Sequence, residues 1–88
     1  MNADRRKTIA EVQDRILAAL EILNSCQQDV EDVQNEEQEA FDNMPENLQG
    51  SEKGQVMEEA ISLMEDLAST LNDACDSIND SLDQVVEL

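Results

Sequence analysis

In the stretch NMPENLQGS, residues 43–51, a proline and a glycine interrupt a chain that has only one other glycine and no other proline. Pro45 lacks the amide hydrogen that a helix interior needs, and it disfavours helical geometry at Met44. Gly50 can adopt a positive φ, and Ser51 is a favourable N-cap residue for a following helix. We therefore expect a turn over residues 44–51 that joins two helices of one domain.

The residues before this turn repeat every seven positions. One apolar series is Ile9, Ile16, Leu23, Val30 and Met44, with Glu37 interrupting it; a second series, three residues later each time, is Val12, Ala19, Cys26, Val33 and Ala40. Such spacing predicts a helix with one apolar stripe from about residue 4 to residue 43. Asn2 or Asp4 can cap it, and Thr8 with Glu11 has the spacing of a capping box.

The residues after the turn repeat by four and three without a miss. The series is Met57, Ile61, Met64, Ala68, Leu71, Cys75, Ile78, Leu82 and Val85, and it is widened on one side by Ala60, Leu67, Ala74 and Leu88. This pattern predicts a second helix over about residues 52–86. Because a short turn between two long helices makes them antiparallel, we expect an all-α fold, with residues 1–88 forming a single two-helix hairpin domain.

Two helices alone leave much of each apolar stripe exposed to water. The segment 16–23 is apolar nearly all the way round, and it lies near the last residues of the chain in an antiparallel hairpin. We expect a homodimer that forms a four-helix bundle, with a different protein covering this surface as the alternative. The residues expected at the dimer interface are Ile16, Leu17, Leu20, Ile22, Leu23, Ile78, Leu82, Val85 and Val86.

The formal net charge is −17, and it is unevenly distributed. Four of the five basic residues lie in the first fifteen positions, and Lys53 is the only cation among the later ones, which carry nineteen carboxylates. Such a surface repels nucleic acid and anionic membranes, so we expect a basic protein surface as its partner. No apolar stretch approaches a signal peptide or a membrane span, so the sequence is interpreted as cytoplasmic.

The chain offers little for catalysis. It contains no histidine, no glycine-rich phosphate loop and no EF-hand spacing of carboxylates. We therefore expect no enzymatic activity, no cofactor and no metal site. Cys26 and Cys75 fall on the predicted core stripes at similar heights, where we expect small, reduced core residues rather than a disulfide. Phe41, Met44, Met57 and Met64 cluster at the turn end, where we expect them in the core.

Carboxylates follow the second helix at heptad spacing with no lysine between them. Like charges three or four residues apart destabilise a helix by roughly 0.2–0.5 kcal/mol per pair, so this arrangement is not the stability optimum. It is either a solvated face that keeps the protein dissolved or a surface that binds a basic partner. The candidate partner-binding residues are Asp29, Glu31, Asp32, Glu36, Glu39, Asp42, Glu59, Asp66, Asp73, Asp76, Asp80, Asp83 and Glu87.

The stretch EEQEAFDNMPENLQGSEKGQ, residues 36–55, followed by an acidic helix, resembles small acidic proteins encoded by bacteriophages and prophages. The resemblance covers about residues 34–67, and it carries no functional residues over. The resemblance implies a location in the cytoplasm of a host cell. It also implies a function among small acidic phage proteins that bind and block host enzymes such as restriction and CRISPR effectors, sometimes as mimics of DNA.

These observations predict an acidic inhibitor that engages a basic, nucleic-acid-binding surface of a host protein. The alternative is a structural or assembly-chaperone bundle whose apolar stripe is the functional surface. The two differ in salt dependence, because an electrostatic partner dissociates as salt rises toward about 0.5 M and an apolar partner does not.

Overall fold

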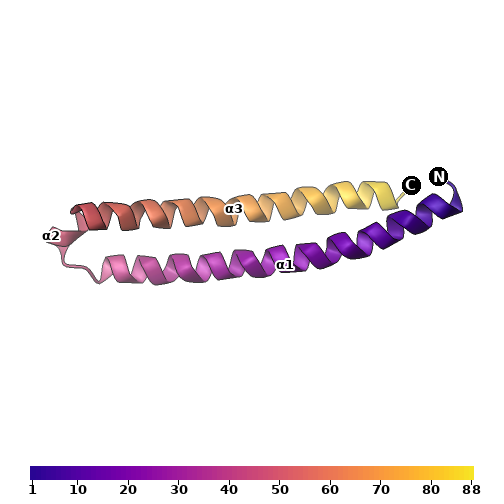
Figure 1. The fold of residues 1–88 in the computed structure, drawn as a ribbon. Coiled ribbons are helices and arrows are strands. Elements are labelled where there is room, and N and C mark those ends of the chain that lie inside the picture. Colours follow the sequence, from indigo (N-terminus) through magenta and orange to yellow (C-terminus); the bar gives the residue numbers. More distant parts are fainter.

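The structure is a computed structural model that describes all 88 residues. It contains three helices and no strand: α1 (Ala3–Asp42), α2 (Glu46–Gln49) and α3 (Glu52–Val86). The long helices α1 and α3 run antiparallel and side by side, with α2 in the turn between them (Figure 1). The molecule measures 67 × 15 × 14 Å, and both termini lie at the end opposite the turn, called here the free end. The helical hairpin expected from the sequence is therefore present.

Each long helix begins at a residue whose side chain caps it. The Asn2 side-chain oxygen accepts a hydrogen bond from the Arg5 backbone N–H at 2.9 Å. The Ser51 hydroxyl accepts one from the Gly54 N–H at 3.3 Å. Both residues have extended backbone geometry, which is typical of N-caps. Asn2, rather than Asp4 or Thr8, is thus the cap of α1.

The turn is held by backbone groups and by one glutamine. The Pro45 carbonyl accepts hydrogen bonds from the N–H groups of Leu48 and Gln49, at 2.8 and 3.2 Å, which closes the single turn of α2. The Gln49 side-chain amide donates to the carbonyls of Phe41 and Met44, both at 3.1 Å. The Phe41 carbonyl also accepts a hydrogen bond from the Met44 N–H at 3.0 Å, whereas the Met44 carbonyl lies just beyond α1, after the last helical N–H. Gln49 therefore fastens the turn to the first helix.

The two glycines of the turn region have different roles. Gly50 has φ −83°, so the turn does not use the positive φ that glycine permits, and a Cβ at this position would meet open space. Gly54 is buried in the first turn of α3, where an added Cβ would lie 2.1 Å from the Gln49 carbonyl oxygen. Close approach of α2 to α3 therefore requires glycine at position 54 and not at position 50.

The packing seam between α1 and α3 confirms one predicted series of α1 and corrects the other. The series that begins at Ile9 is half-buried along its length, with Glu37 included. The second buried series lies four residues after the first, not three: Gln13, Leu20, Gln27, Gln34 and Phe41. Of the residues predicted for it, Ala19, Cys26, Val33 and Ala40 are exposed, and only Val12 is half-buried. On α3 the predicted stripe forms the seam from Met57 to Cys75 and again at Leu82, whereas Ile78 and Val85 remain exposed.

The core of a single hairpin is thin. Only Leu20, Ala68, Cys75 and Leu82 are buried hydrophobic residues. The radius of gyration is 19.8 Å, whereas a compact 88-residue domain has about 12 Å. An elongated pair of helices has no third layer to enclose its seam, and many apolar side chains therefore remain in contact with solvent.

Candidate interaction surfaces

The seam divides the surface of the hairpin into two long faces. We assign heptad positions a and d to the two seam series, so that Leu20 and Leu82 are at a and Ile16 and Ile78 are at d. At 3.6 residues per turn, g positions point about 90° to one side of the seam and e positions about 70° to the other. Because the helices are antiparallel, their g positions share one face and their e positions share the opposite one.

Two surface grooves support this assignment. One groove is lined by Val12 of α1 and Ser81 of α3, which are both g positions. Another is lined by Ala10 of α1 and Val86 of α3, which are both e positions. The two faces are therefore real surfaces of the folded hairpin. We call the face formed by e and b positions the acidic face, and the face formed by g and c positions the apolar face.

The acidic face carries eight carboxylates and one cation, Lys7. The carboxylates are Asp14, Glu21, Glu31, Asp42, Glu58, Glu65, Asp76 and Asp83. The outward edges of the hairpin, at the f positions, are also acidic. On α3 the f positions are Glu52, Glu59, Asp66, Asp73, Asp80 and Glu87. All ten carboxylates from Glu52 onward therefore lie at b, e or f, and none lies on the apolar face.

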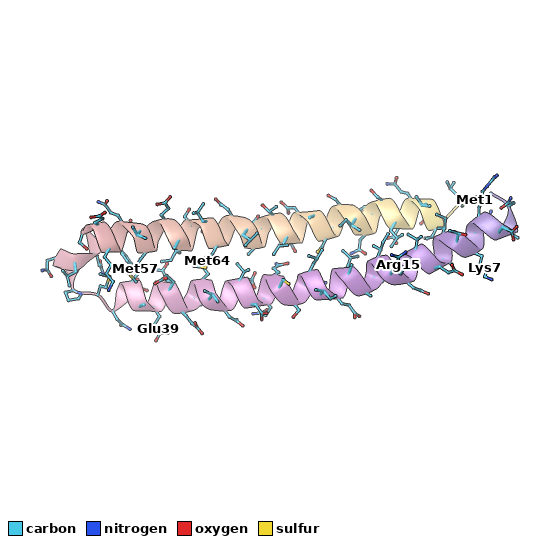
Figure 2. The ribbon with its side chains drawn as sticks, in the orientation of Figure 1. Met1, Lys7, Arg15, Glu39, Met57 and Met64 are labelled. Atoms are coloured by element: carbon cyan, nitrogen blue, oxygen red, sulfur yellow. The ribbon has the colours of Figure 1, made fainter.

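The candidate partner-binding residues do not share one surface. The seven on or after α3 lie at f and b, which makes one exposed strip along the back of that helix. The six on α1 are spread over four heptad positions around its turn half, and Glu31 among them is half-buried. Glu39 points away from α3, on the outer edge of α1 (Figure 2). The α3 strip is thus a continuous surface, and the α1 residues surround their helix.

The apolar face has the opposite composition. Its apolar side chains are Val12, Ala19, Ile22, Cys26, Val33 and Ala40 on α1, and Val56, Ala60, Leu63, Leu67, Ala74 and Leu88 on or after α3. Several of the large ones are more than half exposed, with values of 66% for Ile22, 60% for Leu63 and 59% for Val56. The α1 series that was expected in the seam, Val12 to Ala40, is therefore the α1 half of this face.

Near the free end, the apolar face is hollowed by an open groove of about 420 Å³. Its eight lining residues are Ile9, Val12, Ile16, Ser77, Ile78, Ser81, Leu82 and Val85. Ser77 and Ser81 are small, so the seam beneath them is uncovered, and Ile78 and Val85 remain 37% and 39% exposed. The groove has an almost entirely apolar lining and no charged residue, so it suits another apolar side chain.

The nine residues expected at a dimer interface are distributed over the seam and both faces. Ile16, Leu20, Leu23 and Leu82 are buried or half-buried in the hairpin seam, and Ile78 and Val85 occupy seam positions but remain exposed. Leu17 and Val86 lie at e positions on the acidic face, and only Ile22 lies on the apolar face. The sequence therefore located the apolar free end, but it did not identify which side of the hairpin is uncovered.

The cysteines are not equivalent. Cys75 is buried in the seam at 4% exposure, as expected, whereas Cys26 is exposed on the apolar face. The expectation of a buried Cys26 was wrong, because the seam uses Gln27 in its place. At the turn end, Met57 and Met64 lie between the two helices (Figure 2), where they are half-buried together with Phe41 and Met44.

No group of three or more His, Cys, Asp or Glu side chains has a geometry that could hold a metal ion. None of the helices has an apolar segment of the length and hydropathy that a membrane span requires. Comparison of the chain with protein-family models, with curated proteins and with solved structures gave no match.

Proposed function

We propose that this chain is an acidic binding protein that inhibits its target by covering a basic, nucleic-acid-binding surface. The observation that carries the proposal is the placement of the ten carboxylates from Glu52 onward, all at b, e or f positions of α3. Hairpin formation does not require this placement, since like charges at such spacings weaken a helix. With Glu52, which is also an f position, the strip extends to Glu87, about 50 Å at the rise of an α-helix, and is long enough to follow a nucleic-acid-binding groove.

The density of charge supports competition with nucleic acid. Over its length of 67 Å, one hairpin has a net charge of −17, about one charge per 4 Å. Two hairpins side by side would carry twice this charge, about one per 2 Å, compared with one per 1.7 Å in B-DNA. A dimer therefore approaches the linear charge density of a duplex, and a single hairpin does not. For this reason the proposal includes self-association into a four-helix bundle.

The proposed setting is the cytoplasm of a bacterial host, with the chain encoded by a bacteriophage or prophage. The resemblance of residues 36–55 to such proteins supports this setting, and it makes host nucleases and other defence proteins the first targets to test. Long-range attraction between the acidic strip and a basic groove would raise the association rate, and it would weaken with added salt.

A displacement assay tests the proposal. Each member of a panel of bacterial restriction nucleases and CRISPR effectors is first loaded with a fluorescent duplex DNA. The protein is expected to release the duplex from at least one of them at about 0.1 M salt and to fail at about 0.5 M. The combined variant Asp66→Asn, Asp73→Asn and Asp80→Asn is expected to weaken release by about tenfold or more, mainly through slower association.

A matched control removes three outward carboxylates from α1, with Glu11→Gln, Asp32→Asn and Glu39→Gln. The net charge changes equally, so a loss of less than about threefold is expected if the α3 strip is the binding surface. Equal losses in both triple variants would show that the overall charge matters and the strip does not. Failure to displace duplex from any target in the panel would contradict the inhibitor function.

A second candidate function is favoured by the exposed apolar face. A structural or assembly-chaperone bundle would use that face, and not its carboxylates, to hold a partner. Its partner would remain bound at about 0.5 M salt and would be lost on Leu63→Ser or Leu67→Ser. The displacement assay and this salt test therefore separate the two candidates.

A further inference from the structure

The apolar face is the part of the surface that the proposed function leaves unused. We propose that a second copy of this chain covers it, with the two hairpins packed face to face and their turn ends pointing in opposite directions. The inference rests on the proposed self-association and adds which face is covered, in which orientation, and which residues meet at the symmetry axis. It does not depend on the basic partner.

The exposed area fits one additional copy. The chain exposes 6483 Å², whereas a compact protein of 9.8 kDa exposes about 5,200 Å². The difference is about 1,300 Å², and a stable interface buries about 800 Å² per partner. One face of the hairpin, 67 Å long and 15 Å wide, has a projected area of about 1,000 Å². Pairing of two such faces would therefore remove most of the excess area.

The charge on the apolar face favours a second copy there over the acidic face. The face carries the cations Arg5, Arg15 and Lys53 and only two carboxylates, Asp29 and Glu36. Its charge is therefore +1 in a chain whose net charge is −17. Two acidic faces would bring many carboxylates together, whereas two apolar faces bring almost no net charge together.

Charge also selects the relative orientation of the copies. Arg15 lies toward the free end of the apolar face, and Glu36 lies toward the turn end, at nearly equal distances from Cys26. With turn ends opposed, Arg15 of each copy would lie beside Glu36 of the other. With turn ends together, Arg5 and Arg15 would face the free end of the second copy, and only Lys53 would face its turn end, where the two carboxylate-rich turns would adjoin and repel one another.

Shape selects the same orientation. On α3, the turn half of the apolar face has large side chains at c, Val56 and Leu63, and the other half has Thr70 and Ser77. The 420 Å³ groove lies under the small half, at Ser77 and Ser81. Opposed turn ends would place Val56 of one copy over Ser77 of the other, where it can fill the groove. Turn ends together would place groove over groove and leave both hollow.

The heptad register fixes the residues at the axis. Antiparallel pairing of the α1 helices would match Val12 with Ala40 and Ala19 with Val33, which leaves Cys26 facing Cys26. Pairing of the α3 helices would match Ala60 with Ala74 and leave Leu67 facing Leu67. Arg6 donates a hydrogen bond to the Leu88 carbonyl at 2.6 Å, so Cys26 and Leu67 lie at nearly the same height in one hairpin. A single two-fold axis can therefore pass through both the Cys26 pair and the Leu67 pair.

Cross-linking of Cys26 tests the arrangement. The full chain carries Cys75→Ala, so that Cys26 is the only thiol, and a short bis-maleimide is added at micromolar protein concentration. A covalent dimer is expected in high yield. A matched variant carries Cys75→Ala, Cys26→Ser and Val33→Cys, so it keeps one thiol on the same face. In the dimer, the thiol of one copy would lie about 21 Å from that of the other. Its yield is expected to be at least about tenfold lower.

A third variant distinguishes the orientations. This variant carries Cys75→Ala and Leu67→Cys. If the turn ends lay together, the cross-linker would join Cys26 of one copy to position 67 of the other, and the variant with Cys26 as its only thiol would give no covalent dimer. Light scattering on the same samples reports the mass without cross-linker. A mass of two chains without Cys26 cross-linking overturns the arrangement and leaves self-association standing. A folded single-chain mass at all concentrations overturns both.

Discussion

The two faces that flank the seam have the same length and lie on the same two helices, yet their compositions are opposite. The acidic face carries eight carboxylates and one cation, whereas the apolar face carries two carboxylates, three cations and six of the twelve exposed large hydrophobic side chains. This difference would not stabilise a single hairpin, because both of its faces would be in contact with solvent. This asymmetry is the basis for proposing that the two faces have different surroundings: solvent or a basic partner at the acidic face, and an apolar surface at the apolar face.

The largest effect is expected from a single carboxylate placed on either face. Leu67→Asp puts a charge at the proposed two-fold axis, where it would be buried against its own copy, so the dimer should lose at least about 3 kcal/mol. Asn72→Asp adds the same charge at an e position of the acidic face, where it stays solvated. Its effect is expected to be below about 0.5 kcal/mol. Urea denaturation followed by circular dichroism compares the two, and equal losses would contradict the difference between the faces.

The next effect concerns the turn, which sets the seam register and hence the position of both faces. Gly54→Ala is expected to destabilise the hairpin by about 1–3 kcal/mol, because its Cβ would collide with the Gln49 carbonyl, 2.1 Å away. Gly50→Ala meets open space at an ordinary φ, so it should be neutral or stabilising by up to about 1 kcal/mol. Thermal unfolding measures both, and a tolerated Gly54→Ala would show that α2 does not pack as described.

A smaller effect is expected where a polar residue occupies the seam. Gln27→Leu should stabilise the hairpin by about 1 kcal/mol, since a half-buried position gains apolar area. Cys26→Ser, one residue away on the apolar face, should leave hairpin unfolding nearly unchanged at concentrations where the protein is monomeric. If Cys26→Ser destabilised the hairpin and Gln27→Leu left its stability unchanged, the seam would have the register first expected from the sequence.

The smallest effect is expected in the strip of carboxylates along α3. Asp76→Asn and Asp80→Asn relieve like-charge pairs three and four residues apart, each of which costs a helix roughly 0.2–0.5 kcal/mol. The melting temperature should therefore rise slightly, and more at low salt than at high salt. A fall in the melting temperature would mean that these carboxylates make stabilising contacts within the dimer, and the α3 strip would then not be free for a partner.

The sequence predicted the helices, the turn and the α3 stripe because each rests on a local pattern of apolar residues and capping groups. It did not predict the α1 register, because the series that begins at Ile9 can be paired with a second series three residues later, from Val12, or four residues later, from Gln13. The smaller residues of one series, such as Ala19 and Ala40, look more apolar than the glutamines of the other. The seam nevertheless buries the series that contains Leu20 and Phe41, whose large side chains remove more apolar area from water.

Other features depend on contacts between segments and could not be read from local pattern. The Gln49 clamp needs the end of α1 beside the turn, and the requirement for Gly54 follows from the position of the Gln49 carbonyl. The separation of carboxylates from the apolar face also becomes visible only when the seam is known. Without the correct register, Cys26 and Val33 were assigned to the core, and the α1 half of the exposed face was not recognised.

The most direct test of the account compares thiol reactivity on the two faces as protein concentration rises. One variant keeps Cys26 on the apolar face with Cys75→Ala, and the other carries Asn24→Cys on the acidic face with Cys26→Ser and Cys75→Ala. We predict that maleimide labelling at Cys26 slows by about tenfold or more on dimerisation, while labelling at position 24 keeps its rate. Labelling rates at both positions that do not change with concentration, in a helical protein, would contradict it.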